Sequence, residues 1–465
     1  MSQHSEAKFT HGGLMRHVSV MSFTSSIGLM AIFAVDFIDI IFISMLGNAA
    51  LAAAVGYAGT VLFFTTSMAI GFSIALGALV ARALGEGNKQ AAREYATSVL
   101  VMGIAISLIT VFVVFMNMGS LLSLLGADEG TRALAVDFLT IIIPTMPILM
   151  AAIMAGAVLR AYGDAKRAMY ATLAAGVVNA VLDPLLIFTL DMGLEGAATA
   201  SAIARFVVLA VGMYPAIKRY DAFAPPAWSF IKRDTKRVFN IALPAVMTNV
   251  ATPVGTAIVT REMARFGTDA VAGMAVISRL TPVAFAVVFA LSGAIGPIIG
   301  QNSGAGLQAR VRGAFIAGLQ FVLVYVIVVS VVLFLLRNTI VTGFEATGDA
   351  EVLILLFCGP LALAFFFNGV LFVSNAAFNN LGHPFYSTMI NWGRNTVGVL
   401  PFVLLGASWY GAAGVLLGQA IGGVVFAVVS YVLAWKLVNA EYTTGKKSQS
   451  FWQQARIHML QSRHR

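Results

Sequence analysis

Residues 95–117 read YATSVLVMGIAISLITVFVVFMN, a stretch without a single charged side chain. A helix of about 20 mostly apolar residues is long enough to cross the hydrocarbon core of a bilayer. The whole chain has the same character, because 59% of its 465 residues are hydrophobic and only 11% are charged. Soluble domains carry about 25% charged residues. The composition therefore excludes a soluble globular enzyme and predicts an all-α integral membrane protein.

Similar apolar runs recur along the chain on both sides of this stretch, and we expect twelve transmembrane helices in two six-helix lobes. The expected spans are 18–46, 50–81, 95–117, 132–159, 168–190, 196–217, 238–264, 270–300, 312–336, 351–378, 386–407 and 411–436. The polar stretch in the middle suggests a division into parts. We expect an N-terminal lobe at 1–217, a cytoplasmic linker at 218–237, a C-terminal lobe at 238–437 and a basic cytoplasmic tail at 438–465.

The positions of the basic residues predict the orientation. Lys and Arg are enriched in cytoplasmic loops of membrane proteins. With the N-terminus inside, the inner segments hold 22 of the 29 Lys and Arg residues and the outer loops hold three. We therefore expect a multi-pass protein of the bacterial inner membrane with both termini in the cytoplasm. The net charge of +9 then reflects topology, and we expect no nucleic-acid partner.

The two halves of the chain resemble each other. Gly85 and Gly87 match Gly304 and Gly306 at an offset of 219 residues. Three further anchors recur within two residues of the same offset, namely 47–52 with 267–272, Gly163 with Gly382, and Gly193 and Gly196 with Gly411 and Gly414. An even number of spans returns the chain to its starting side. We therefore expect two lobes related by pseudo-two-fold symmetry along the membrane normal, as in transporters built from parallel repeats.

Charged side chains at membrane depth are costly and by default indicate function. In the first half they are Asp36 and Asp39 in the first span and Asp183, one turn after Asn179, in the fifth. Pro184 follows directly and bends the helix. With Ser201 of the sixth span, these oxygens predict a site for a proton or for Na⁺, the latter at Asp39, Asn179 and Asp183. The alternative is a purely structural role, in which the aspartates accept hydrogen bonds from neighbouring hydroxyls or form an ion pair with Arg205.

The second half carries amides instead of mid-membrane acids. Asn368 and Asn375 can hydrogen-bond a substrate but cannot titrate, so we expect them, together with Arg205, to line a substrate cavity. The sequence contains no HExxH, no phosphate-binding GK[ST] loop and no nucleophile elbow. We therefore expect no enzymatic activity, no cofactor and no other metal, with H⁺ or Na⁺ as the coupling ion.

Several short motifs, weak alone but specific in their order and spacing, resemble the multidrug and toxic compound extrusion (MATE) family over about residues 18–437. They are Asp39 eight residues before Gly47, 159–166 with LRAYGDAK, Asn179-x-x-x-Asp183-Pro184, Gly193-x-x-Gly196, Gly85-x-Gly87 and 300–306 with GQNSGAG. The family's helix-one proline is absent, because Thr24, Ser25, Ser26 and Gly28 occupy that stretch. An acid found in the tenth helix of one branch is Asn368 here, which resembles the DinF-type branch.

The resemblance implies a secondary active multidrug efflux transporter. Such a protein exports cationic or aromatic small molecules by H⁺ or Na⁺ antiport, with alternating access between two lobes. Its cation site carries over onto Asp39, Asn179, Asp183 and, where a threonine is common, Ser201. The expected partners are small-molecule drugs or organic cations and the lipid bilayer, and the expected state is a monomer. The alternatives are a lipid-linked precursor flippase of the related superfamily, a major-facilitator transporter and an intramembrane enzyme.

Overall fold

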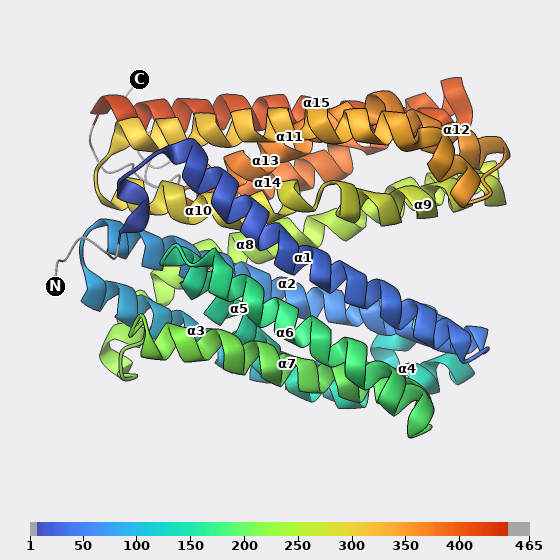
Figure 1. The fold of residues 1–465 in the computed structure, drawn as a ribbon, viewed down its shortest axis with the longest axis horizontal. Helices are drawn as coiled ribbons and strands as arrows, with labels where there is room; N and C mark the ends of the chain where they lie inside the picture. The colour runs from blue at the N-terminus through green and yellow to red at the C-terminus, as the bar shows by residue number, and fades with distance from the viewer. Residues whose placement is uncertain (1–6, 445–465) are drawn as a thin grey trace, which may run out of the picture. The chain divides into compact units, whose positions relative to one another are not determined.

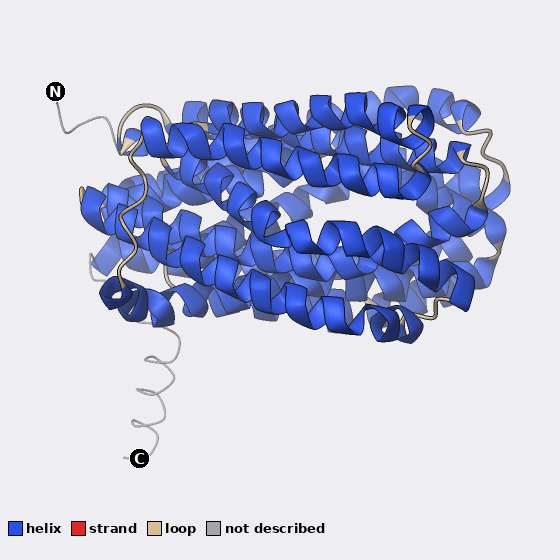
Figure 2. Ribbon diagram, turned by 90° about the horizontal axis from the view of Figure 1, so that it is seen from below, coloured by secondary structure: helices blue, strands red, loops and turns tan. Residues whose placement is uncertain are grey.

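A computed structural model describes residues 7–444 of the chain, and the basic segment 445–465 lies outside the described residues. Every regular element in this range is helical, and no strand occurs in it (Figure 2). The prediction of an all-α membrane protein is therefore confirmed. Figure 1 gives the helix labels used below.

The first half consists of long helices joined by short turns. They are α1 (Leu14–Met45), α2 (Ala49–Gly85), α3 (Lys89–Leu124), α4 (Glu129–Ile142), α5 (Met146–Ala161), α6 (Ala165–Pro184) and α7 (Gly193–Lys218). Short irregular helical pieces complete two of them. These are the 3₁₀ turn η3 (Ile143–Thr145), which joins α4 to α5, and the π-helical turn η4 (Leu185–Thr189), which extends α6.

The second half repeats this layout. Its helices are α8 (Trp228–Met263), α9 (Thr268–Ala284), α10 (Ala286–Gly304), α11 (Gln308–Gly343), α12 (Gly348–Leu356), α13 (Ala362–Asn380), α14 (Pro384–Gly393) and α15 (Leu400–Thr444). Between them lie the 3₁₀ turn η5 (Ala264–Phe266) and the π-helical turns η6 (Phe357–Leu361) and η7 (Arg394–Gly398). The 3₁₀ turn η2 (Lys8–Thr10) precedes α1.

Within the described residues, eleven helical segments are long and apolar enough to cross a membrane. The last of them, Pro384–Ala440, has 57 residues and is broken at Tyr410 and Gly411, where the backbone leaves the helical conformation. A straight helix of that length would extend about 85 Å at 1.5 Å per residue, far beyond a hydrocarbon core of about 30 Å. The break therefore turns this segment into two spans, and twelve spans result.

The turns between helices show the internal repeat in the backbone. Gly87 ends the turn after α2 and Gly306 ends the turn after α10, and both have φ of 71°. This left-handed conformation is costly for residues with a Cβ atom, which explains glycine at both matched positions. The other three anchor pairs also carry glycine with positive φ in both copies.

The helices group into two compact units. One comprises Thr24–Val246, and the other comprises Met1–Phe23 together with Met247–Arg465. The boundaries fall inside α1 and α8 rather than in the connection between the halves. That connection is also shorter than the expected linker at 218–237, because α8 already begins at Trp228.

The connection between the halves is fastened to α3 of the Thr24–Val246 unit. Arg93 donates to the carbonyl of Phe223 (3.1 Å) and pairs with Asp221 (3.0 Å), while Thr97 Oγ1 donates to the carbonyl of Ala224 (2.8 Å). The next residue of α3 is Ser98, and its Oγ donates to the fully buried carboxylate of Asp234 on α8 (2.9 Å). These bonds explain why the start of α8 belongs to the first unit.

The segment before α1 is fastened to the other unit in the same way. Phe9 is fully buried, and its N–H donates to Oε1 of Gln301 on α10 (2.8 Å). Its carbonyl accepts from Asn302 Nδ2 (3.1 Å) and from the guanidinium of Arg310 (2.9 Å). Gln301 and Asn302 belong to the glycine-rich motif 300–306, so this motif holds the start of the chain.

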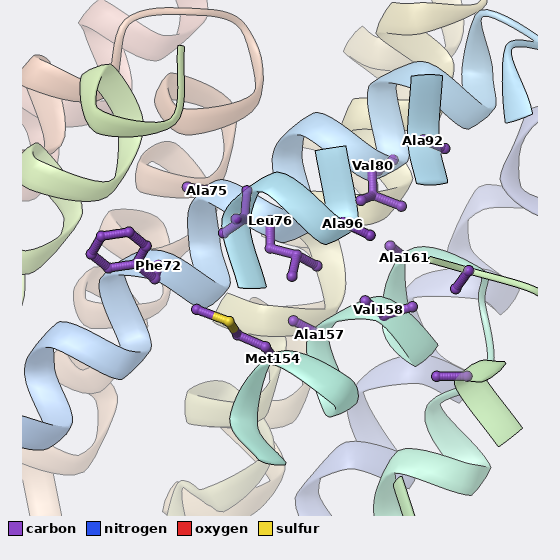
Figure 3. Close-up of a cluster of buried hydrophobic side chains, with 14 of the residues drawn as sticks. Phe72, Ala75, Leu76, Val80, Ala92, Ala96, Met154, Ala157, Val158 and Ala161 are labelled. Carbon is purple, nitrogen blue, oxygen red and sulfur yellow. The ribbon is translucent and has the colours of Figure 1, made fainter. Parts of the chain in front are cut away.

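The core of the Thr24–Val246 unit is built largely from small residues. In Figure 3, Leu76 and Val80 of α2 lie against Ala96 of α3 and Val158 of α5. All four side chains are almost fully buried. Small residues let helix backbones approach closely, which is the main way in which helices pack tightly within a bilayer.

The turn between α5 and α6 is held by a charged cluster at Asp164. Its carboxylate accepts from the backbone N–H of Arg167 (3.1 Å), from Tyr220 Oη (2.7 Å) and from the Arg167 guanidinium. Burial raises the pKa of Asp164, but the hydrogen bonds from Tyr220 and Arg167 outweigh it and hold this pKa below its ordinary value. Asp164 therefore stays ionised at neutral pH and acts as scaffold within the motif 159–166.

Candidate functional site

Helices α1 and α6 lie against each other in the Thr24–Val246 unit, and their glycines set the register. A Cβ atom on Gly28 would come within 2.9 Å of Thr172 Oγ1, and one on Gly176 within 3.5 Å of a methyl group of Val35. The contacts advance in the same direction along both helices, so the helices run parallel. Gly28 and Thr172 are 144 residues apart in the sequence. Asp39 and Asp183 have the same separation and lie three turns further along the two helices, so they face each other in the same way.

The structure brings Asp39, Asn179 and Asp183 together as the sequence predicts. The carboxyl groups of Asp39 and Asp183 are close enough to act on each other electrostatically. Asp183 is 1% exposed and Asn179 is 8% exposed. Oδ1 of Asp39, Oδ1 of Asn179 and both carboxyl oxygens of Asp183 are buried and accept no hydrogen bond from any described residue. Four buried acceptor oxygens therefore lie without donors on two adjacent helices.

Such an arrangement is unfavourable unless a cation completes it, because buried polar groups without partners cost free energy. A proton on one carboxyl group would let it donate to the other and would remove a negative charge. Oxygen atoms are also the ligands that hard cations prefer. Within residues 7–444, no group of three or more His, Cys, Asp and Glu side chains is placed to hold a metal ion. The oxygens present fit a monovalent cation shared by two carboxylates and one amide.

Irregular backbone supports the Asp183 end of the site. Pro184 ends α6, and the chain continues as the π-helical turn η4. Helix α7 passes this turn closely, because a Cβ atom on Gly196 would lie 2.8 Å from the carbonyl carbon of Leu186. π-Helical turns are frequent at functional sites. The glycine in the motif Gly193-x-x-Gly196 thus allows α7 to pack on the distorted end of α6.

Two further predicted residues contribute no buried, unpartnered oxygen to this cluster in the described part of the chain. The side chain of Asp36 is exposed on α1, although the charge of Asp39 still acts on it. Ser201 is partly buried on α7, and no hydrogen bond joins it to Asp39 or Asp183 in the described part of the chain. Among the predicted cation-site residues, all of which the structure describes, the buried oxygens without donors come from Asp39, Asn179 and Asp183.

The residues expected to line a substrate cavity divide between the two units. Arg205 lies in the Thr24–Val246 unit, where its guanidinium donates to the carbonyl of Ile142 (3.0 Å) and to Thr145 Oγ1 (2.7 Å). Asn368 and Asn375 lie on α13 of the other unit. Asn375 Oδ1 accepts from Asn391 Nδ2 (3.2 Å), whereas Asn368 Oδ1 accepts from the guanidinium of Arg394. Within the described residues, Arg205 therefore has neutral oxygen partners and no aspartate partner.

Sequence reasoning assigned no role to Arg394. Its neighbours come from α13 and α15, so the residues next to it in the sequence do not identify them. The available signal was an arginine within a span of a half that has no mid-membrane acid. The same unit contains a row of buried amides at Asn379, Asn391 and Asn395.

Comparison with known proteins supports the assignment of the fold. The MatE family model matches residues 25–185 and 244–405. An FAD transporter of Shewanella oneidensis is 29% identical over 426 residues, covering 90% of this chain and 93% of that protein. The probable multidrug resistance protein YpnP of Bacillus subtilis is 24% identical, covering 88% and 92%. The structure of the Vibrio cholerae MATE transporter VcmN in the bent form superposes with a TM-score of 0.86 at 24% identity, covering 92% and 98%.

The two matched segments together span more than two thirds of the chain, and each coincides with one repeat. The repeats and the twelve spans agree with this match. The chain therefore belongs to the MatE family and is a multi-pass membrane transporter rather than an enzyme.

Proposed function

We propose that this protein is a secondary transporter of the DinF-type branch that exports small aromatic or cationic molecules in exchange for H⁺ or Na⁺. The observation that carries the proposal is the set of buried, unpartnered oxygens of Asp39, Asn179 and Asp183. An ion shifts the balance between two access states only through its differential affinity for them. Groups whose charge or coordination changes supply that difference, and these two acids are such groups.

Relatives suggest two kinds of substrate. YpnP is named a probable multidrug resistance protein, which supports aromatic or cationic drugs. The Shewanella oneidensis relative is named an FAD transporter and is the more similar of the two, at 29% identity against 24%. Export of a flavin nucleotide is therefore the second candidate function. Both candidates use the same ion site and differ in the molecule that is exchanged.

Transport by the purified full-length protein in liposomes tests the proposal. The vesicles contain either ethidium, an aromatic cation, or FAD, and a pH gradient and a Na⁺ gradient are imposed separately. We expect one of the two gradients, and not the other, to accelerate release of at least one of these compounds above that from protein-free vesicles. Equal release with and without both gradients would contradict ion-coupled export.

The orientation is a further prediction, in a monomer of the inner membrane with both termini in the cytoplasm. Trp228, at the start of α8, and Phe344, in the turn after α11, are both exposed, at 76% and 47%. Each is changed to cysteine in a variant whose buried Cys358 is replaced by alanine. We expect a membrane-impermeant maleimide to label position 344 in intact cells and position 228 only after permeabilisation. The reverse pattern would refute this topology.

A further inference from the structure

Arg394 lies well inside a membrane span of the unit that contains Met247–Arg465. It follows Pro384, the first residue of α14, by ten residues. At 1.5 Å per residue this is about 15 Å along the axis, half the thickness of a hydrocarbon core of about 30 Å. Arg394 is also the first residue of the π-helical turn η7, which redirects side chains relative to a regular helix.

Glycines of α15 leave room for the guanidinium. A Cβ atom on Gly423 would lie 3.7 Å from Nε and 3.8 Å from Nη2 of Arg394, which is ordinary contact. The guanidinium therefore lies between α13 and α15, two helices that pack directly on each other. Arg394 and Asn368 are both only partly buried.

The protein does not neutralise this charge. Asn368 Oδ1 is the hydrogen-bond acceptor of Arg394, and no ion pair joins Arg394 to a carboxylate in the described residues. The acids of this unit's described part lie near helix ends or in turns, at Glu262, Asp269, Glu345, Asp349, Glu351 and Glu441. A guanidinium has five N–H donors, so donors remain for a further acceptor.

A single positive charge at membrane depth is costly, and such charges mark substrate pathways. The planar fork of arginine matches phosphate and carboxylate oxygens, often with two parallel hydrogen bonds. Arg205 differs, because two neutral oxygens of its own unit already accept from it. Near Arg394 the amides of Asn391 and Asn395 are buried on the same helical stretch and offer neutral polar surroundings.

We propose that Arg394, positioned by Asn368, binds an anionic group, phosphate or carboxylate, of the transported molecule. The site lies in a different unit from the acids that we assign to the coupling ion. A substrate with an anionic group fits it better than a simple organic cation does. The inference rests on the proposed transport function, because it specifies the substrate class of the same transporter.

Binding of two flavins to the full-length protein in phosphatidylcholine nanodiscs tests this site. FMN and riboflavin share the aromatic ring system and differ by one phosphate group, and their fluorescence anisotropy reports binding. We expect FMN to bind about tenfold to a hundredfold more tightly than riboflavin, the factor that a charge-assisted hydrogen bond contributes. In Arg394→Gln this preference should vanish, and Arg394→Lys should retain part of it.

Arg337→Gln is the matched control. Arg337 is in the same unit but lies over the ring of Phe334 near the end of α11, so the preference for FMN should stay as in wild type. Size-exclusion profiles equal to wild type show that the Arg394 variants are folded. Equal binding of both flavins to wild type, absence of FMN binding, or an unchanged preference in Arg394→Gln would overturn the proposal.

Two further measurements distinguish the anion site from lipid binding at Arg394 and from the ion-coupled function. Nanodiscs with phosphatidylglycerol supply an anionic lipid headgroup, and loss of FMN binding in them would assign Arg394 to lipid and overturn the substrate proposal. The gradient assay with ethidium is run in liposomes with the same purified proteins. Gradient-driven ethidium release without a preference for FMN would refute only the anion site. The preference without any gradient-driven transport would refute only the ion-coupled function.

Discussion

Asp39→Asn and Asp183→Asn are each expected to reduce gradient-driven transport to the level of protein-free vesicles. Both carboxyl groups contribute buried oxygens that lack hydrogen-bond donors. An amide cannot release a proton and offers no full negative charge to Na⁺, so either change removes the differential ion affinity that couples the two access states. The measurement is the initial rate of substrate release under the imposed ion gradient, in proteoliposomes with equal amounts of protein.

The control for this prediction is Asp137→Asn. Asp137 lies on α4 of the same unit, but its side chain is exposed, so its neutralisation should leave the rate unchanged. Because asparagine is nearly isosteric with aspartate, all three variants are expected to reach the membrane. Wild-type rates in well-expressed Asp183→Asn would show that the ion binds elsewhere.

A second large effect is expected where α15 folds back on itself. After the break at Tyr410 and Gly411, its second part packs on its first part through glycines spaced four residues apart. A Cβ atom would lie 1.8 Å from the Gly406 oxygen if added to Gly414, and 2.2 Å from the Phe402 oxygen if added to Gly418. On Gly422 it would lie 1.9 Å from the Gly398 oxygen. Each clash is with backbone, which cannot rotate away.

We therefore expect Gly414→Ala and Gly418→Ala to lower the thermal unfolding midpoint clearly and to reduce the yield of monodisperse protein. Overpacking of a core typically costs about 1–3 kcal/mol, and backbone clashes lie at the upper end of that range or above it. The direct measurement is thermal unfolding of the purified protein in detergent.

Gly119→Ala serves as the comparison, because Gly119 is inside α3 and a Cβ atom there would meet nothing within 4 Å. In an open helical position alanine is expected to be neutral or to stabilise by about 0.5–1 kcal/mol. Unfolding midpoints of Gly418→Ala and Gly119→Ala that agree with each other would refute the role of the α15 glycines.

Much of the fold followed from the sequence because hydropathy and glycine turns are local signals. The apolar runs predicted the twelve spans, and the offset between Gly87 and Gly306 predicted the repeat. The assignment of Met1–Phe23 to the unit of the second half could not be predicted. It depends on the burial of Phe9 against Gln301 and Asn302, which is a contact between distant segments.

The candidate site was predictable to a similar degree. Acids at membrane depth are rare enough to identify Asp39 and Asp183 individually, and the structure places them together. Asp36 could not be assigned in this way. Its spacing of three residues from Asp39 places both on one side of the helix, but only the neighbouring helices decide which of the two side chains is covered. Arg394 could not be interpreted from sequence for the same reason, since its partners Asn368 and Gly423 lie on other helices.

Helices α1 and α8 each begin in one unit and end in the other. A gene cut in the connection at 219–227 would consequently encode two polypeptides, neither of which contains a complete unit. The first fragment would lack the start of α8, with the buried Asp234 that bonds Ser98, and the second would lack the Phe9 segment. Each fragment would carry the missing piece of the other. Each unit is therefore completed by a segment that the other half of the gene encodes, as each subunit is in a domain-swapped dimer.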